Sequence, residues 1–280
     1  MPEITSKTPI LITGCQRSGT TLMNLVLNSH PKIWSIDEDV FFLPSIYAYL
    51  CNPRMPPFVA FKLPEYAHLL PFIKTLPDRR VIWCIRDPLD AVWSMVKLRL
   101  NLAGISASWA VHTGGGWGEI INSIWVLSEK QKSALAEPMK EFHRLTDKFV
   151  KLSQSTKDLT VIEREECVFM AALCWRIKNE MPALYQAENI DFHIAKYEEI
   201  VAEPKERIEK VLDYIGAEWS DEVLRHHQKH EGKSIGETSN TRPIDKDSVG
   251  RGKENLTQAE QDIVKSICEQ AATEWGYELN

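Results

Sequence analysis

Residues 14–21 form a glycine-bounded loop whose composition suits it to bind an anion. They read Gly-Cys-Gln-Arg-Ser-Gly-Thr-Thr and lie between a short apolar run and a segment with helical periodicity. Such a loop presents backbone N–H groups and the positive end of a helix dipole to a ligand. The glycine spacing matches that of nucleotide-binding P-loops, but Thr20 stands where those loops carry lysine. Arg17 supplies a cation instead, and its guanidinium can bind two phosphate oxygens at once.

Other charged residues that could do chemistry follow further along the chain. Lys62 lies in the segment Phe-Lys-Leu-Pro, an acidic run spans residues 37–39, and Arg86 ends an apolar run. A lysine ammonium can stabilise negative charge that develops on a leaving oxygen. A carboxylate near a desolvated acceptor can take its proton. The acidic run could instead cap a helix that begins near Val40.

Five segments of the chain together resemble the sulfotransferases that use 3′-phosphoadenosine 5′-phosphosulfate (PAPS). They occur in the family's order: the phosphosulfate loop 14–22, the Lys-x-Pro segment 61–64, the 3′-phosphate motif 86–94, and the segments 196–200 and 248–251. The Lys-x-Pro segment resembles the bacterial and tyrosylprotein-sulfotransferase branch. The resemblance implies an α/β fold with a P-loop NTPase-like parallel sheet flanked by helices. It also implies direct in-line transfer of a sulfuryl group to a hydroxyl or amine, with release of adenosine 3′,5′-bisphosphate.

The resemblance also implies roles for individual residues. The 5′-phosphate would be bound by Arg17 and by the backbone N–H groups of Ser18, Gly19, Thr20, Thr21 and Leu22. The 3′-phosphate would be bound by Arg86, Ser94 and Arg251, and Tyr197 would line the adenosine pocket. Lys62 would stabilise the leaving oxygen. Three alternatives stay open: a surface salt bridge of Arg86 with Asp87 or Asp90, a helix-surface position for Ser94, and a solvated loop position for Arg251.

The catalytic base is inferred from a departure from the family pattern. Cytosolic sulfotransferases place a histidine two residues after the lysine, but this chain has Pro64 there. The tyrosylprotein branch uses a glutamate after the helix that follows the phosphate loop, and that register falls on Glu38. Asp37 and Asp39 are the next candidates. That branch carries arginine two residues after its glutamate, whereas this chain has Val40, which argues against an acidic peptide acceptor.

The elements that must position these residues alternate between strands and helices. Apolar runs predict strands over 9–14, 80–86 and 190–196, and the helical segments 18–29 and 90–100 follow the first two strands. This alternation predicts a parallel sheet with helices on both faces. A mostly helical run over 164–188 follows. The chain ends in a helix that Thr257 and Glu260 begin with a capping box and whose buried face would include Trp275.

Two segments break this alternation within what we expect to be a single domain over residues 1–280. Residues 101–160 predict an insertion or lid that sets substrate specificity. Its tryptophans would be core residues or the wall of an acceptor pocket: Trp109, Trp117 and Trp125. Residues 232–256 predict an ordered or ligand-gated loop. A histidine group before this loop fits a solvated helix face better than a metal site: His226, His227 and His230.

Composition restricts the function further. The chain has 280 residues, with 33 Lys+Arg against 39 Asp+Glu, so its net charge of −6 argues against a general nucleic-acid binder. No apolar run is long enough for a membrane helix and no signal peptide is evident, so we expect a cytoplasmic protein.

The six cysteines are scattered and predict buried free thiols. Arg86 stands where a magnesium-binding acid would end a strand, so we expect no metal.

The predicted partner is therefore a small-molecule acceptor such as a secondary metabolite, without a nucleic acid or a membrane. Two other functions stay open: a Mg²⁺-dependent P-loop small-molecule kinase, and a non-catalytic nucleotide-binding protein. The kinase is disfavoured by Thr20 at the lysine position of the loop. The binding protein is disfavoured by Lys62 and Glu38, since binding alone requires neither.

Overall fold

The computed structural model describes residues 7–37, 43–69, 71, 76, 78–102, 126–147, 163–234 and 238–279. The chain forms two compact units. The sheet unit comprises Met1–Gly14, Ser18–Ile85 and Glu188–Lys246, and the helical unit comprises Cys15–Arg17, Arg86–Ala187 and Asp247–Asn280.

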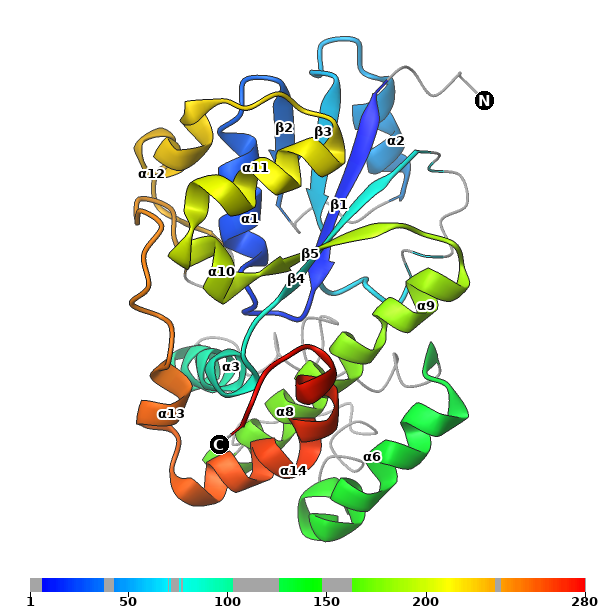
Figure 1. The fold of residues 1–280 in the computed structure, drawn as a ribbon, viewed down its shortest axis with the longest axis vertical. Helices are drawn as coiled ribbons and strands as arrows, with labels where there is room; N and C mark the ends of the chain where they lie inside the picture. The colour runs from blue at the N-terminus through cyan, green and yellow to red at the C-terminus, as the bar shows by residue number, and fades with distance from the viewer. Residues whose placement is uncertain are drawn as a thin grey trace. The chain divides into compact units, whose positions relative to one another are not determined.

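The sheet unit is built on five parallel strands in the order β2-β3-β1-β4-β5 (Figure 1). The strands are β1 Thr8–Gly14, β2 Ile33–Ile36, β3 Phe58–Lys62, β4 Arg80–Ile85 and β5 Phe192–Lys196. The three predicted strands correspond to β1, β4 and β5, so the prediction of a parallel sheet is confirmed. Strands β2 and β3 were not predicted, and β3 carries Lys62 at its last position.

Helices cover both faces of this sheet, as predicted (Figure 1). The helical segments of the unit are α1 Thr20–Asn28, α2 Leu43–Cys51, α10 Tyr197–Ala202, α11 Pro204–Ile215, the 3₁₀ turn η4 Asp221–Arg225 and α12 His226–Lys229. On one face, apolar residues of α1 and α11 pack against Ile10 and Ile12 of the central strand. On the other face, Tyr49 of α2 meets Phe61 of β3 edge to face, with ring centroids 6.4 Å apart.

The helical unit contains α3 Pro88–Leu102, α6 Glu129–Glu141, α8 Arg164–Glu180, α9 Pro182–Ala187, α13 Arg251–Asn255 and α14 Gln258–Glu274. Helix α8 is buried along most of its length and packs against both α3 and α14. The predicted capping box of α14 is confirmed: the Thr257 hydroxyl accepts the Glu260 N–H at 3.3 Å, and the Glu260 carboxylate accepts the Thr257 N–H at 2.8 Å. Trp275 lies one residue beyond the helix and is half-buried, with its indole donating to the Asn179 carbonyl at 3.0 Å.

The two segments that break the alternation contain regular structure. The 232–256 segment is more than a loop, because it holds a short hairpin of β6 Lys233–Ser234 with β7 Thr238–Ser239, and helix α13. Helix α3 extends to Leu102, and α6 lies within the predicted insertion. Residues 103–125 and 148–162 lie outside the described residues, and with them all three tryptophans of that prediction, so the lid stays a prediction.

The histidine group is not a solvated helix face, and this prediction was wrong for His226. That side chain is only 1% exposed, and its Nε2 donates to the Arg242 carbonyl at 3.1 Å. His230 is half-buried, with its Nε2 3.1 Å from the Ser29 hydroxyl. His226 thus contacts the chain that follows α12, whereas His230 contacts α1 and the residue after it. Among the residues that the structure describes, no group of three His, Cys, Asp or Glu side chains could hold a metal ion.

Burial lowers the pKa of His226 to about 4, which makes stability depend on pH. The unfolded chain, with an ordinary histidine pKa near 6.5, takes up a proton that the folded chain resists. Stability from this ring is therefore complete above about pH 6.5 and is lost as the pH falls toward 4. We expect the free energy of unfolding, measured by urea titration at pH 7 and pH 5, to fall more in the native protein than in His226→Gln. An equal fall in both would contradict this prediction.

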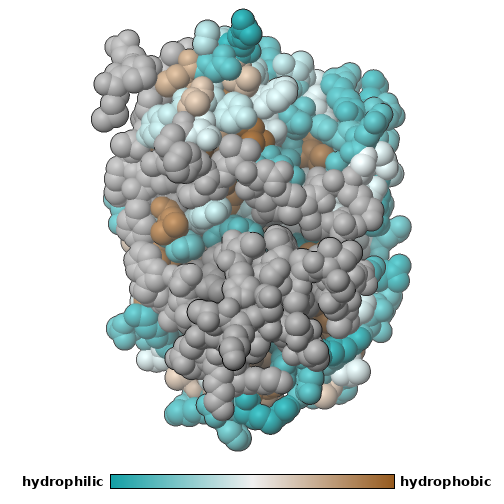
Figure 2. All heavy atoms as spheres, turned by 180° about the vertical axis from the view of Figure 1, so that it is seen from behind, coloured by the Kyte–Doolittle hydropathy of each residue, from teal (hydrophilic) through white to brown (hydrophobic). Residues whose placement is uncertain are grey.

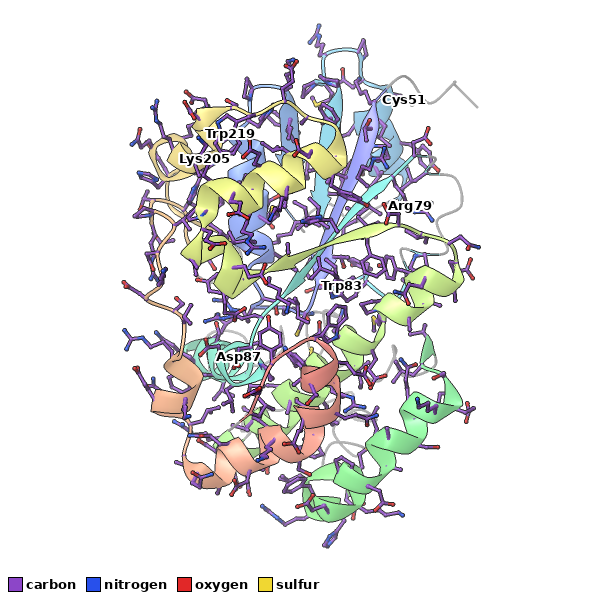
Figure 3. All side chains as sticks on the ribbon, in the orientation of Figure 1. Cys51, Arg79, Trp83, Asp87, Lys205 and Trp219 are labelled. Atoms are coloured by element: carbon purple, nitrogen blue, oxygen red, sulfur yellow. The ribbon has the colours of Figure 1, made fainter. Side chains whose placement is uncertain are left out.

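The surface of the described residues is mostly polar. In the face shown in Figure 2 the described residues are largely hydrophilic, with a few separated apolar patches. Large apolar side chains that are exposed include Trp34 and Val249, at 48% and 40%. Lys205 of α11 covers the Trp219 ring at 5.8 Å from its centroid (Figure 3), so part of this aromatic surface is shielded by a cation. No described helix is both long and apolar enough to span a bilayer.

Candidate functional site

The phosphate loop leads from β1 into α1, as the sequence predicted. Gly19 is the N-cap of α1 in the left-handed conformation, with φ of +93°, and it offers no side chain to cap the helix. A Cβ atom at this position would lie 2.9 Å from Cδ2 of Tyr197. Glycine is therefore required both by the backbone and by the ring that packs on it. The uncapped start of α1 leaves its first N–H groups for another acceptor, which suits an anion.

The Lys62 cluster consists of Lys62, Thr21 and Asp37, all in the sheet unit. The Lys62 side chain is 1% exposed, and its Nζ donates to the Thr21 hydroxyl at 3.1 Å. The same Nζ lies 2.6 Å from Oδ1 of Asp37. Lys62 ends β3 beside Ile12 of β1, and Asp37 directly follows β2, so the carboxyl ends of parallel strands bring the two charges together. A buried ammonium needs such a partner because its desolvation would otherwise be costly.

The Arg86 cluster consists of Arg17, Arg86, Ser94, Asp90 and Ser248, all in the helical unit. Arg17 adopts a left-handed backbone with φ of +65°, which costs a non-glycine residue about 1 kcal/mol or more. Its Nε donates to the Ser94 hydroxyl at 3.0 Å, and its carbonyl accepts from Arg86 Nη1 at 3.3 Å. The strained backbone therefore places three predicted phosphate ligands together.

Arg86 is a buried side chain rather than a surface one. Its Nη2 lies 3.6 Å from the buried Oδ2 of Asp90 and also donates to the Ser248 carbonyl. The alternative of a salt bridge with Asp90 is thus realised, but inside the protein. The backbone of Arg86 is fixed from helix α8, because the Trp175 indole donates to its carbonyl at 2.9 Å. Asp87, labelled in Figure 3, accepts the Asp90 N–H at 3.2 Å and so begins α3.

Arg251 and Tyr197 are placed by local structure. Arg251 is the exposed first residue of α13, and its Nε donates to the Asp247 carbonyl at 2.8 Å while its Nη1 lies 3.0 Å from Glu254. Tyr197 begins α10 and is half-buried, with its ring against the glycine of the phosphate loop. Their contacts with a nucleotide stay predictions.

Glu38, the predicted base, and Asp39 lie outside the described residues. Sequence reasoning ranked Asp37 only as a substitute for Glu38 and did not anticipate its ion pair with Lys62. Two residues of α8 were also missed. Trp175 holds Arg86, and the Cys174 thiol donates to the Gln16 side chain at 3.4 Å. The sequence shows that both side chains carry a hydrogen-bond donor, but their partners lie 158 and 89 residues away in the chain.

Two pKa shifts belong to thiols near these residues. Burial raises the pKa of Cys84 to about 12, and burial together with Cys174 raises that of Cys15. The six cysteines form no disulfide with one another, and five of them are buried, as predicted. Raised thiol pKa values leave little thiolate at neutral pH, so we assign Cys15 and Cys84 a packing role.

Comparisons with known proteins agree with one another. Residues 7–276 match the family described as "Sulfotransferase domain". A Caenorhabditis briggsae protein described as a "Putative protein-tyrosine sulfotransferase" is 22% identical over 254 residues, covering 78% of this chain and 69% of that protein. Two solved structures share the fold. The sulfotransferase domain from the curacin biosynthetic pathway has a TM-score of 0.59 at 15% identity, covering 98% of this chain and 99% of that one. The sulfotransferase domain of the Synechococcus PCC 7002 olefin synthase has a TM-score of 0.56 at 14% identity, covering 100% and 98%.

Proposed function

We propose that this chain, which belongs to the sulfotransferase family, transfers a sulfuryl group from PAPS to a hydroxyl or amine of a small-molecule acceptor. The observation that carries the proposal is the Lys62 cluster, in which a buried lysine lies 3.1 Å from a threonine of the phosphate loop. A P-loop kinase has its lysine inside the loop. Here the ammonium comes from β3 instead, in the segment that resembles the sulfotransferase lysine.

The family resemblance assigns a part of the proposed co-substrate to each cluster separately. In the sheet unit, the uncapped start of α1 would bind the 5′-phosphosulfate through backbone N–H groups. In the helical unit, Arg86 and Ser94 would bind the 3′-phosphate. Arg17 would bind the 5′-phosphate with its charged fork, and its Nε lies 3.0 Å from the Ser94 hydroxyl. Bonds between charged partners are the stronger kind, so these arginines would dominate nucleotide affinity.

The proposed reaction is a direct in-line transfer. The acceptor oxygen or nitrogen forms a bond to sulfur while the bond from sulfur to the 5′-phosphate oxygen breaks, and adenosine 3′,5′-bisphosphate leaves. The acceptor's proton passes to a carboxylate, for which we propose Glu38. The ammonium of Lys62 stabilises the negative charge that develops on the leaving oxygen. The protein aligns the partners and stabilises charge, which is where catalysis of such transfers resides.

We propose a small acceptor, such as a secondary metabolite. Val40 replaces the arginine that the tyrosylprotein branch carries two residues after its glutamate, so that feature for an acidic peptide is missing. Two structural relatives, described as domains of the curacin pathway and of an olefin synthase, support this choice. We propose a cytoplasmic location, which the six free cysteines support, because free thiols are typical of reducing compartments.

Thermal unfolding with nucleotides tests this function. At about 100 times its Kd, adenosine 3′,5′-bisphosphate adds about 2.7 kcal/mol of stability, which raises the Tm of a protein of this size by several degrees. We expect this shift without Mg²⁺, and a much smaller one with ADP. The Arg17→Met variant should lose most of the shift. Arg207→Met, which removes an arginine of α11 that pairs with Glu203, should keep it.

Two results would contradict the proposal, and each favours a different function. A shift only with ATP and Mg²⁺ would overturn the proposal in favour of a kinase. A shift with the bisphosphate but no sulfated product from any acceptor class would favour the non-catalytic binding protein. The acceptor screen should therefore include phenols, aliphatic alcohols and amines. The release of adenosine 3′,5′-bisphosphate measures sulfuryl transfer to each acceptor.

A further inference from the structure

Asp90 of α3 makes contacts that the proposed chemistry does not use. Its carboxylate is 2% exposed, and Oδ2 accepts the Gly250 N–H at 2.8 Å while Oδ1 accepts the Gly252 N–H at 2.7 Å. Both amides lie at the start of α13, and all three residues belong to the helical unit. One side chain thus binds two backbone groups that the short helix cannot pair within itself. This joins two segments that are 160 residues apart in the sequence.

The contact between α13 and α3 is also a close backbone approach. A Cβ atom on Gly252 would lie 2.2 Å from the carbonyl carbon of Leu89 and 2.6 Å from the Asp90 nitrogen. Real Cβ atoms do not come this close to backbone, so any side chain at this position would push α13 away from α3. The contact between α13 and α3 therefore depends on two residues. Asp90 provides the carboxylate that accepts the amides, and Gly252 has no side chain that would prevent the close approach.

This contact reaches Arg86 directly. The Oδ2 atom that accepts the Gly250 N–H also lies 3.6 Å from Nη2 of Arg86. Arg86 in turn donates to the carbonyl of Ser248, two residues before Gly250. The segment 248–252 is thus fixed at both of its ends around one guanidinium. Two backbone N–H groups and the guanidinium together compensate the charge of Asp90, so its carboxylate adds little repulsion toward a nearby anion.

We propose that Asp90 is a positioning residue that makes the protein selective for 3′-phosphorylated nucleotides. It fastens the segment 248–252 against Arg86, so that guanidinium and segment present one preformed surface to the 3′-phosphate. Asp90 itself does not touch the phosphate. This inference rests on the proposed function, since it assigns the 3′-phosphate to Arg86. Preformed contacts raise affinity because no ordering is required on binding.

The test compares two nucleotides that differ only in the 3′-phosphate. Isothermal titration calorimetry would measure Kd for adenosine 3′,5′-bisphosphate and for adenosine 5′-monophosphate in native protein and in Asp90→Asn. Asparagine keeps the shape but loses the charge and one acceptor. We expect the Kd of the bisphosphate to rise about tenfold or more, as for the loss of hydrogen bonds to a charged group, and that of the monophosphate to stay nearly constant.

Glu260→Gln is the matched control. Glu260 is another carboxylate of the helical unit that accepts a backbone N–H, at 2.8 Å, and pairs with an arginine, at 2.6 Å. It should lower stability without changing the ratio of the two Kd values. Gly252→Ala loosens the same contact from the side of α13, and we expect it to reduce the ratio as Asp90→Asn does. It also replaces that variant if Asp90→Asn does not fold.

Hydrogen exchange gives a readout without any variant. The bisphosphate should slow exchange of the amides of residues 248–252, and the monophosphate should not. Equal loss of both affinities in Asp90→Asn, or an unchanged ratio, would overturn the positioning role and leave Asp90 a structural residue. If the native protein itself binds the two nucleotides equally, the proposed function fails instead, so the two failures are distinguishable.

Discussion

Lys62→Met is expected to lower turnover by about a thousandfold while leaving the affinity for adenosine 3′,5′-bisphosphate nearly unchanged. Removing one preorganised donor from a site of developing negative charge has an effect of this order. The bisphosphate resembles the state after the sulfuryl group has left, and in the proposed function its two phosphates would be bound mainly by backbone groups and arginines. A loss confined to turnover would mean that Lys62 acts in the transition state more than in binding.

The surroundings of Lys62 determine how this experiment must be controlled. Methionine fills a similar volume, but it leaves Asp37 without the ammonium that lies 2.6 Å from its Oδ1. The double variant Lys62→Met with Asp37→Asn removes both charges and separates this effect from catalysis. Lys32→Met is a control for the loss of a lysine, because Lys32 is exposed and pairs with an exposed carboxylate, Glu218, at 2.7 Å.

Stopped assays of sulfated product and calorimetry of the bisphosphate provide the two measurements. If turnover falls less than about tenfold, the loss is smaller than that of an oxyanion-stabilising donor, and Lys62 is then a structural charge. If bisphosphate affinity falls in parallel with turnover, Lys62 contributes uniform binding instead. Restored turnover in the double variant would identify the unpaired Asp37, and not the lost ammonium, as the cause.

The β1–loop–α1 unit could be predicted from the sequence because its signals are local. An apolar run, two glycines and a helical period follow one another within residues 9–29. Strands β2 and β3, with four and five residues, were not predicted, although β5 has five residues and was. Short apolar runs do not distinguish a strand from a buried helix segment. Helix α11 carries usable signals, Pro204 at its start and Gly216 after its end, and could have been predicted from them.

The candidate site was predictable in its residue types, but of its pairs only the near neighbours Arg86 and Asp90 were anticipated. Arg17 and Ser94 are both recognisable, yet their 3.0 Å contact joins positions 77 residues apart. The same is true of Asp90 and the start of α13, where two glycine amides carry no pattern that identifies an acceptor. Such contacts form only when separate elements pack together. Local patterns in a single sequence predict the elements but not which of them pack against each other.

Glu38→Gln is expected to lower turnover by about a hundredfold or more, as the loss of a general base does. The native rate should rise with pH as the base loses its proton, and this acidic limb of the pH–rate profile should disappear in the variant. Asp37→Asn should keep the limb, because Asp37 is the ion-pair partner of Lys62 at 2.6 Å. Because the Asp37 carboxylate is already engaged with the Lys62 ammonium, we assign it to that ion pair and not to proton transfer.

The contrast between the two variants therefore identifies the base. Both replacements remove one negative charge from the same short run of the chain, so a general electrostatic effect on the nucleotide would change both alike. Asp39→Asn completes the series and should retain both rate and limb. If Asp37→Asn abolishes the limb and Glu38→Gln does not, Asp37 is the base. In that case Lys62 must release Asp37 before this carboxylate takes the acceptor's proton.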